Sequence, residues 1–431
     1  MRIAVIVCRF PVLSETFILN QITGLIERGH EVDIYAEGWG DRSKVHPDVE
    51  KYRLLDRTYL LTEVPTNLVW RLLKGLGLFL ENFYKAPRFL LKSLNVADYG
   101  LQAAGLWLMY SAISLINKQP YDLIHCQFGT QGYRGMFFRN VLHPQPKLIV
   151  TFRGHDISRY VFEHGDRIYD ELFKTADFFL ANCEFFRQRA IQLGCDPDRI
   201  AVHLSGLDCS KFTFTPRRLE PDSPVRIATT GRLVEKKGVE YAIRAVAQQA
   251  KTHPNIEYQI IGDGPLKDSL QALIQELNAV PYIKLVGWKN EQEIIQILEK
   301  THLFIAPSIT AQDGNQDAPI NVLKEAMAMG LPVISTLHGG IPELVEDNIS
   351  GFLVPERDVD ALSEKLGYLI EHPDRWTEMG HAGRAFVEQH YDIHGLNDRL
   401  VQRYEQLLGR CELEGRSPFS SRIPAPAILH K

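Results

Sequence analysis

The chain has 431 residues and a formal net charge of −5, and 45% of its residues are hydrophobic against 23% charged. These values are typical of a globular protein and argue against a disordered or fibrous chain, and the length predicts two domains of ordinary size. The slightly acidic balance argues against nucleic acid as a partner, since nucleic-acid-binding surfaces carry clustered positive charge.

The cysteines and the N-terminus favour a reduced, cytoplasmic setting. The six cysteines are scattered without a Cys-x-x-Cys pair, so neither a zinc site nor a dense disulfide framework is indicated. Residues 3–8 form a strand-like run too short for the apolar core of a signal peptide, and we expect it to be structural. No run approaches the roughly 18 apolar residues that a membrane-spanning helix requires.

Short apolar strands alternate with amphipathic helices in two series, which predicts two parallel sheets with crossover helices. In the first half the predicted strands are residues 3–8, 31–36, 122–126, 147–152, 177–181 and 200–203. In the second half they are residues 225–230, 256–261, 282–286, 303–306 and 332–335. A polar stretch broken by prolines, residues 206–224, separates the two series and predicts a domain boundary there.

Residues 65–116 form an apolar, aromatic and basic region inside the first series, with Trp70, Lys85 and Arg88 among its members. One interpretation is a helical insertion packed on the N-terminal sheet. Another is contact with an anionic membrane surface, because apolar burial and the attraction of Lys and Arg for acidic lipid reinforce each other. The sequence leaves both interpretations open.

Two basic residues, Arg232 and Lys237, follow a predicted buried strand in the segment 231–238. Loops at the carboxyl edge of a parallel sheet face the ligand-binding crevice. An arginine fork with a lysine point charge can hold a diphosphate and stabilise the charge that grows on it when a bond breaks. The alternative is a pair of solvated loop charges.

A glycine pair, Gly262 and Gly264, follows the next strand and precedes Pro265. Glycines allow the backbone to approach a ligand closely, and the proline predicts a helix start. Because Lys267 stands where Gly-x-Gly-x-x-Gly requires glycine, the segment does not match the dinucleotide-binding pattern. This mismatch argues against a dehydrogenase, although an ordinary strand-to-helix turn remains an alternative.

Two acids, Asp317 and Glu325, lie across the predicted start of a helix that follows the strand ending before Ser308. Their spacing predicts one carboxylate at the helix mouth and the other about two turns in, which suits a polyhydroxylated ligand. The alternatives are an N-terminal cap for Asp317 and a solvated helix-face charge for Glu325. The metal-like spacing of Asp358 and Asp360 lies at another predicted helix start, where capping is favoured.

Taken together, these motifs resemble the donor-sugar site of family 4 glycosyltransferases. The resemblance extends roughly from Ile3 to Leu408 and implies an α/β chain with the GT-B fold, in which two Rossmann-like domains have parallel sheets facing across a cleft. It implies that residues 1–205 bind the acceptor and residues 206–390 bind the nucleotide sugar. Residues 391–431 would form a helix that crosses back to the N-terminal domain, followed by a flexible tail.

The resemblance also assigns roles at the donor site. Asp317 would contact the sugar, Glu325 the ribose, and the amides of Ile320 and Asn321 the phosphates. The family commonly has Glu and Gly where this chain has Asp317 and Ala318, which shortens the reach toward the sugar by one methylene. Residues 338–345 and 351–355 resemble loops that border the donor pocket. The predicted donor site comprises Arg232, Lys237, Gly262, Gly264, Ser308, Asp317, Ala318, Pro319, Ile320, Asn321, Glu325 and Gly340.

In the N-terminal half, residues 14–21 resemble the subgroup of colanic acid and related exopolysaccharide transferases. They supply the acceptor-side candidates Ser14, Glu15, Thr16 and Asn20, although Ser14 or Thr16 could instead cap a helix.

Residues 151–158 resemble the family motif Thr-Phe-His-Gly-x-Asp, but Arg153 occupies the usual histidine position and His155 follows two places later. Both are catalytic candidates. A guanidinium stays protonated, so Arg153 would position a substrate, not deprotonate it. The alternative for His155 is a structural role.

The resemblance therefore implies a retaining hexosyltransferase that uses a UDP-sugar or GDP-sugar, and we expect no metal cofactor. The expected acceptor is a lipid-linked oligosaccharide of cell-surface polysaccharide biosynthesis, at the cytoplasmic face of the membrane. The alternatives are a nucleotide-sugar epimerase or phosphorylase of GT-B type, and a catalytically silent nucleotide-sugar-binding protein.

Overall fold

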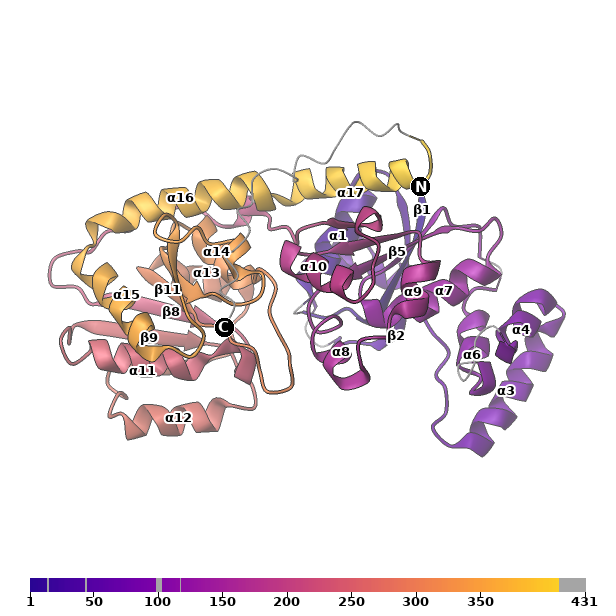
Figure 1. Ribbon diagram of the computed structural model, residues 1–431, viewed down its shortest axis with the longest axis horizontal. Coiled ribbons are helices and arrows are strands. Elements are labelled where there is room, and N and C mark those ends of the chain that lie inside the picture. The colour runs from indigo at the N-terminus through magenta and orange to yellow at the C-terminus, as the bar shows by residue number, and fades with distance from the viewer. Residues whose placement is uncertain (14, 43–44, 98–102, 117, 411–431) are drawn as a thin grey trace.

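The structure, a computed structural model, describes residues 1–13, 15–42, 45–97, 103–116 and 118–410. Figure 1 shows two lobes side by side, each built on one sheet with helices around it. Two long helices, α16 (Asp374–Tyr391) and α17 (Ile393–Leu407), run along one edge of both lobes. The predicted tail, residues 416–431, lies outside the described residues.

The N-terminal sheet is parallel, with the order β3-β2-β1-β4-β5-β6-β7. Its strands are β1 (Arg2–Phe10), β2 (Glu31–Trp39), β3 (Thr58–Leu60), β4 (Leu123–Cys126), β5 (Lys147–Phe152), β6 (Phe178–Ala181) and β7 (Ile200–Val202). The sequence predicted all of them except β3. A three-residue edge strand is too short to show the alternation of apolar and polar residues by which strands are recognised.

Helices of this half surround the sheet and also form the insertion. They are α1 (Thr16–Glu27), α2 (Pro47–Lys51), α3 (Leu68–Phe83), α4 (Pro87–Ser93), α6 (Trp107–Ile113), α7 (Gly132–Val141), α8 (Arg159–His164), α9 (Asp170–Thr175) and α10 (Glu184–Gln192).

The C-terminal sheet is also parallel, with the order β10-β9-β8-β11-β12-β13. Its strands are β8 (Val225–Thr230), β9 (Ile256–Ile261), β10 (Ile283–Gly287), β11 (Leu303–Ala306), β12 (Val333–Thr336) and β13 (Gly351–Val354). The last strand corrects the sequence analysis, which placed residues 351–355 in a loop. Phe352 and Val354 are buried in the core of this lobe, so the segment is an edge strand.

The helices of the C-terminal half connect these strands and continue beyond them. They are α11 (Val239–Gln249), α12 (Lys267–Glu276), α13 (Glu291–Glu299), α14 (Asn321–Ala328) and α15 (Val359–Glu371), followed by α16 and α17. Asp358 caps α15 through a 2.9 Å hydrogen bond from the Ala361 amide, as predicted.

The final helix α17 belongs to the core of the N-terminal lobe. Leu400 and Tyr404 are buried in the same apolar cluster as Val5 and Ile22, and α17 packs against α1. The Tyr404 hydroxyl lies 2.6 Å from Nδ1 of His125 at the end of β4. The chain therefore returns to its first lobe after completing the second.

The insertion forms a small helical module on the N-terminal lobe. Leu90, Met109 and Tyr110 make a separate apolar cluster between α3, α4 and α6. The module contacts α7 through α4 and α6, and Lys92 donates a hydrogen bond to the carbonyl of Asn140. No helix in the described part of the chain is long and apolar enough to span a bilayer.

Candidate functional site

Four loops of the C-terminal lobe meet at the carboxyl edge of its sheet, because parallel strands all end on the same side. They follow β8, β9, β11 and β12 and comprise residues 231–238, 262–266, 307–320 and 337–345. Backbone hydrogen bonds join neighbouring loops. The Leu233 amide donates to the Asp263 carbonyl at 3.0 Å, and the Ile309 amide donates to the Lys236 carbonyl at 2.9 Å.

The glycine pair brings two of these loops into direct contact. Gly262 has a φ of +145°, and a Cβ built on it would lie 1.8 Å from the carbonyl oxygen of Gly231. A Cβ at Gly264 would lie 2.6 Å from the carbonyl oxygen of Leu233. The sequence analysis expected these glycines to admit a ligand. In the structure they admit the neighbouring loop that carries Arg232, and Pro265 lies in a turn before α12.

Asp317 is the centre of a buried charge cluster. Lys237 Nζ lies 2.8 Å from Oδ2 of Asp317, and Lys236 Nζ lies 2.9 Å from Oδ1. The hydroxyl of Ser308 donates to Oδ2 at 3.0 Å. Asp317 is therefore not a helix cap, because its carboxylate is engaged by two lysines of the loop after β8 and by a serine of its own loop.

The electrostatics of this cluster favour an anion. Burial would raise the pKa of the Asp317 carboxyl, but Lys237 and Lys236 hold that pKa well below its usual range. Burial lowers the pKa of Lys237, Asp317 opposes that effect, and Lys236 and Arg232 add to it. Arg232 is exposed in the same loop as Lys236 and Lys237. With a single acid among three cations, the cluster retains positive charge.

The Asp317 backbone is fixed by a histidine in the loop after β12. The amide of Asp317 donates to Nε2 of His338 at 2.9 Å, so Nδ1 carries the histidine proton and donates to Glu356 at 2.6 Å. Gly339 has a φ of +52°, and a Cβ there would lie 2.1 Å from the carbonyl oxygen of Asp317. The orientation of Asp317 therefore depends on residues that follow another strand.

The segment between Asp317 and α14 runs close to the N-terminal lobe. Ala318 packs against the N-terminal core, and a Cβ on Gly340 would lie 2.5 Å from Pro319 and 2.9 Å from the Cys183 sulfur. Ile320 is the N-cap residue and supplies no side-chain cap, so the first amides of α14 have no side-chain acceptor at the helix start.

Glu325 lies within α14, where its carboxylate has no hydrogen bond or ion pair among the described residues. Burial and the nearby Glu291 raise the pKa of Glu325 to about 7, against the opposing effect of Lys324. Because α14 begins at Asn321, Glu325 lies about one turn into the helix. The predicted depth of two turns was wrong, because the residues after Asp317 form an extended loop before the helix starts.

Arg153 is buried, and its guanidinium donates hydrogen bonds to other groups of the protein. Its Nε donates to the Gln127 carbonyl at 3.1 Å, Nη1 donates to Ser205 at 3.3 Å, and Nη2 donates to the side chain of Gln21 at 3.4 Å. Burial lowers the pKa of Arg153 to about 10, with Asp156 opposing. The guanidinium thus ties the loop after β5 to α1 and to the interdomain linker.

His155 has the opposite environment, because its side chain is exposed in the loop after β5. A Cβ on the adjacent Gly154 would lie 3.5 Å from the carbonyl oxygen of Gln316, which precedes Asp317. The Gln316 amide also donates to the Ser158 hydroxyl at 3.3 Å. The loop that carries His155 therefore touches the loop that carries Asp317.

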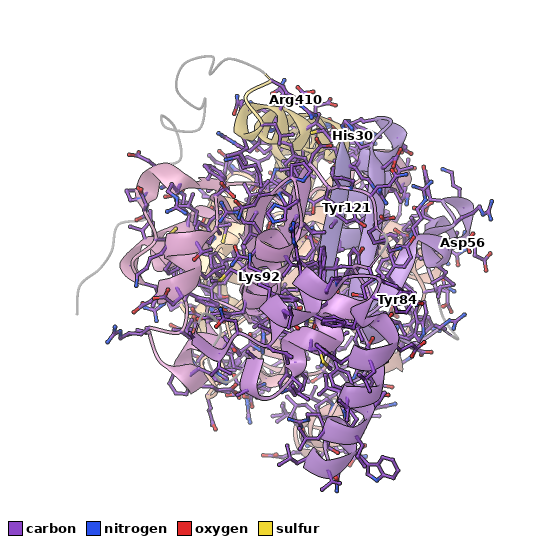
Figure 2. The ribbon with its side chains drawn as sticks, turned by 90° about the vertical axis from the view of Figure 1, so that its right-hand side faces the viewer. His30, Asp56, Tyr84, Lys92, Tyr121 and Arg410 are labelled. Atoms are coloured by element: carbon purple, nitrogen blue, oxygen red, sulfur yellow. The ribbon has the colours of Figure 1, made fainter. Side chains whose placement is uncertain are left out.

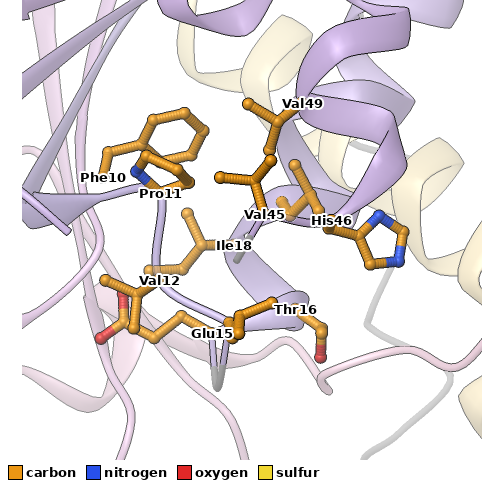
Figure 3. A pocket seen from close by; sticks show the side chains of 11 residues that line it. Phe10, Pro11, Val12, Glu15, Thr16, Ile18, Val45, His46 and Val49 are labelled. Atoms are coloured by element: carbon orange, nitrogen blue, oxygen red, sulfur yellow. The ribbon is translucent and has the colours of Figure 1, made fainter. Parts of the chain in front are cut away.

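The acceptor-side candidates that the structure describes, Glu15, Thr16 and Asn20, do not form one cluster. Glu15 and Thr16 line a small pocket together with Phe10 and Val45, which Figure 3 shows. Burial raises the pKa of Glu15 to about 7, and Arg153 opposes this effect. The Asn20 carbonyl accepts from Asn397 at the contact between α1 and α17. Ser14 lies outside the described residues, and Glu15, not Thr16, is the N-cap position of α1.

Two groups at this edge have partners that the sequence analysis did not predict. Lys236, which forms the second ion pair with Asp317, was not among the predicted site residues. Glu343 accepts hydrogen bonds at 2.7 Å from the amides of Glu184 and Phe185, the first residues of α10 in the other lobe. Burial raises the pKa of Glu343 to about 6, against those two hydrogen bonds. No sequence signal connects a carboxylate to a helix start so distant in the chain.

Comparison with known protein families matches both halves of the chain. The family of glycosyl transferases group 1 matches residues 211–386, and glycosyltransferase family 4 matches residues 14–211. The chain is 35% identical over 406 residues to WcaL of Salmonella typhimurium, a colanic acid biosynthesis glycosyltransferase, covering 93% of this chain and 98% of that protein. It is 35% identical over 411 residues to the amylovoran biosynthesis glycosyltransferase AmsK of Erwinia amylovora, covering 94% of this chain and 100% of that protein.

Solved structures confirm the predicted GT-B fold. Anabaena HepE in complex with UDP-glucose aligns with a TM-score of 0.69 and 18% identity, covering 94% of this chain and 100% of that chain. Sucrose-phosphate synthase from Thermosynechococcus elongatus aligns with a TM-score of 0.69 and 18% identity, covering 95% of this chain and 100% of that chain. With two family models matching its two halves and near full-length relatives, the chain belongs to the group 1 and family 4 glycosyltransferases.

Proposed function

We propose that the protein transfers a hexosyl group, with retention of configuration, from a nucleoside diphosphate sugar to a lipid-linked oligosaccharide. The observation that carries the proposal is the buried cluster of Asp317 with Lys236 and Lys237, beside Arg232, at the carboxyl edge of the C-terminal sheet. A positively charged site with one fixed acid suits a ligand that combines a diphosphate with a hydroxyl-rich sugar.

The residues divide between the parts of the donor. Arg232 and Lys237 bind the diphosphate and stabilise the charge that it gains when its bond to the sugar breaks. The sugar carbon forms its new bond to an acceptor hydroxyl, whose proton leaves with the departing phosphate. The start of α14, which no side chain caps, adds backbone amides that donate hydrogen bonds to phosphate.

Asp317 and Glu325 bind the hydroxyl groups of the donor. Asp317 accepts hydrogen bonds from the sugar, and Glu325 accepts them from the ribose, since its carboxylate has no protein partner among the described residues. Donor binding then replaces part of the contact between Asp317 and Lys237. With three cations at the site, no metal ion is required to neutralise the diphosphate. Among the described residues, no three His, Cys, Asp or Glu side chains are arranged to hold one.

The N-terminal lobe receives the acceptor in this proposal. Because Arg153 is buried and most of its N–H groups donate to protein acceptors, His155 is the exposed group of the loop after β5 that can contact an acceptor hydroxyl. Two relatives along nearly the whole chain are named for colanic acid and amylovoran biosynthesis. Their names support an acceptor from cell-surface polysaccharide assembly, carried on lipid at the cytoplasmic face of the membrane.

Donor binding is tested by thermal denaturation with UDP-, GDP- and ADP-sugars, since a ligand selective for the native state raises the melting temperature. We expect one nucleotide to stabilise the wild-type protein and not the Arg232→Ala variant. Because Arg232 is exposed, this variant retains its fold. No stabilisation by any nucleotide sugar would refute the donor site.

The reaction is tested by product analysis with the selected donor and a lipid extract. A sugar joined to lipid with the donor's anomeric configuration supports the proposal. A free epimer or a sugar phosphate would instead identify an epimerase or phosphorylase. Tight donor binding without turnover, and without slow donor hydrolysis, would identify a silent binding protein.

A further inference from the structure

Helix α3 of the insertion exposes an apolar face along its whole length. The side chains recur every three or four residues and therefore lie on one side of the helix. Each is between 39% and 65% exposed: Val69, Leu72, Leu73, Leu76, Leu80 and Phe83. Trp70 and Tyr84 flank this face and are also exposed.

The other side of α3 is already covered. Leu78 and Phe79 pack against the cluster of Leu90, Met109 and Tyr110, and a Cβ on Gly75 would lie 3.0 Å from Leu106. The helix is therefore apolar on both sides, but the protein covers only one of them. A solvated helix needs only one apolar face, so the second indicates a surface outside the chain.

The helical module stands away from the sheet. Figure 1 shows α3, α4 and α6 at the outer end of the N-terminal lobe, far from the C-terminal lobe. Figure 2 views the molecule from this end, with Tyr84 and Lys92 labelled on it. The apolar face of α3 can therefore meet a flat surface without obstruction by the C-terminal lobe.

The charge of the residues near this face indicates which kind of external surface can bind it. Residues 65–97 contain five basic residues and one acidic residue, Glu81, in a chain whose formal net charge is −5. Lys74, Lys85 and Arg88 are exposed, whereas Arg71 and Lys92 are partly buried and donate hydrogen bonds to backbone carbonyls. A second copy bound through this face about a twofold axis would bring the same excess of positive charge from both copies to one interface, which opposes self-association. An anionic surface attracts this charge.

We propose that α3 lies in the plane of an anionic lipid bilayer, with its outer face buried at the boundary of headgroups and acyl chains. The 16 residues of α3 are too few to span a bilayer, whereas an in-plane helix buries one face and keeps basic groups among lipid phosphates. This contact goes beyond the transfer reaction. It holds the N-terminal lobe at the surface from which a lipid-linked acceptor is presented.

Vesicle cosedimentation of the full chain tests the proposal. We expect binding to phosphatidylcholine vesicles that contain phosphatidylglycerol, weaker binding to pure phosphatidylcholine, and loss of binding as salt screens the charges. Leu73→Ser with Leu76→Ser should lower the partition coefficient about tenfold or more. The matched control, Val280→Ser with Ile349→Ser, removes residues of similar exposure, 50% and 54%, from the C-terminal lobe and should bind as the wild type does.

A charge-reversal pair tests the electrostatic part. Lys85→Glu with Arg88→Glu should reduce binding to anionic vesicles about tenfold or more while leaving weak binding to neutral vesicles unchanged. Lys284→Glu with Lys300→Glu, exposed lysines of the C-terminal lobe, is the control. Equal binding by all variants, or no binding by the wild type, would overturn the proposal. A dimer in light scattering that the leucine substitutions abolish would show that a second copy covers the face.

Vesicle binding requires no turnover, so its outcome is independent of the proposed reaction. Donor-induced thermal stabilisation should be the same in the wild type and in the α3 variants, because the substituted side chains are exposed and far from the donor site. If the donor effect fails while vesicle binding holds, the proposed function is wrong and the membrane contact stands. The reverse result would refute only the membrane contact.

Discussion

Replacing Lys237 with methionine removes the buried cation and keeps most of the volume of its side chain. In the structure the lysine pairs with Asp317 at 2.8 Å, and its side chain is 20% exposed. A fixed charge in such a poorly solvated place stabilises a developing anion strongly, and loss of one comparable group costs about 10²–10³ in kcat. We therefore expect Lys237→Met to lower kcat for sugar transfer, or for slow donor hydrolysis, by that factor.

The Lys237→Met substitution should cost less in the free energy of unfolding than in the activation free energy of the reaction. Removing one partner of a buried ion pair can cost about 3–5 kcal/mol when the other charge is left alone. Here Asp317 keeps Lys236 at 2.9 Å and Ser308 at 3.0 Å, so we expect a loss of about 1–3 kcal/mol in the free energy of unfolding.

The assay is steady-state kinetics with the donor selected by thermal denaturation, together with circular dichroism and denaturant unfolding of each variant. Because the lysine acts on charge that appears during the reaction, kcat should fall by a larger factor than KM rises. Lys251→Met, at an exposed lysine beyond α11, is the matched control and should match the wild type. A folded Lys237→Met variant with wild-type kcat would refute the assigned role.

Three other substitutions test separate features of the site. Since the pKa of Glu325 rises from 4.5 to about 7 on folding, the free energy of unfolding should decrease as pH rises between those values. This decrease should be on the order of 1–3 kcal/mol, and Glu325→Gln should abolish it in denaturant melts recorded over a series of pH values. If the variant showed the same pH dependence as the wild type, the raised pKa of Glu325 would be contradicted. Gly339→Ala should lower stability by about 1–3 kcal/mol and weaken donor binding, because it displaces the neighbouring aspartate. Gly29→Ala has a similarly positive φ with no atom within 4 Å, so it should share the backbone cost but bind donor normally. Glu343→Ala should uncap α10, costing about 0.5–2 kcal/mol. It should also increase the radius of gyration in X-ray scattering if the contact holds the lobes together.

Periodicity in the sequence determined most of the fold. Short apolar runs separated by helical patterns identified nearly every strand of both sheets, because a strand buried on two faces must be apolar throughout. The loops after β8 and β11 were recognised from the residue types and spacing of Arg232, Lys237, Asp317 and Glu325. Segments with weak local signals were lost or misassigned, namely the three-residue β3 and the edge strand β13.

Only the tertiary structure determined how these residues are paired. Lys236 and Lys237 are neighbours in the chain, yet both reach Asp317, because parallel strands bring distant loops to one edge of a sheet. The family position held by Arg153 looked catalytic in the sequence, but burial against α1 and the linker satisfies its guanidinium there. The sequence also left open what covers the outer face of α3, because an apolar run predicts that the face is buried but does not identify the surface against which it packs. Local spacing reveals which groups a chain carries, whereas their partners depend on contacts between segments far apart in sequence.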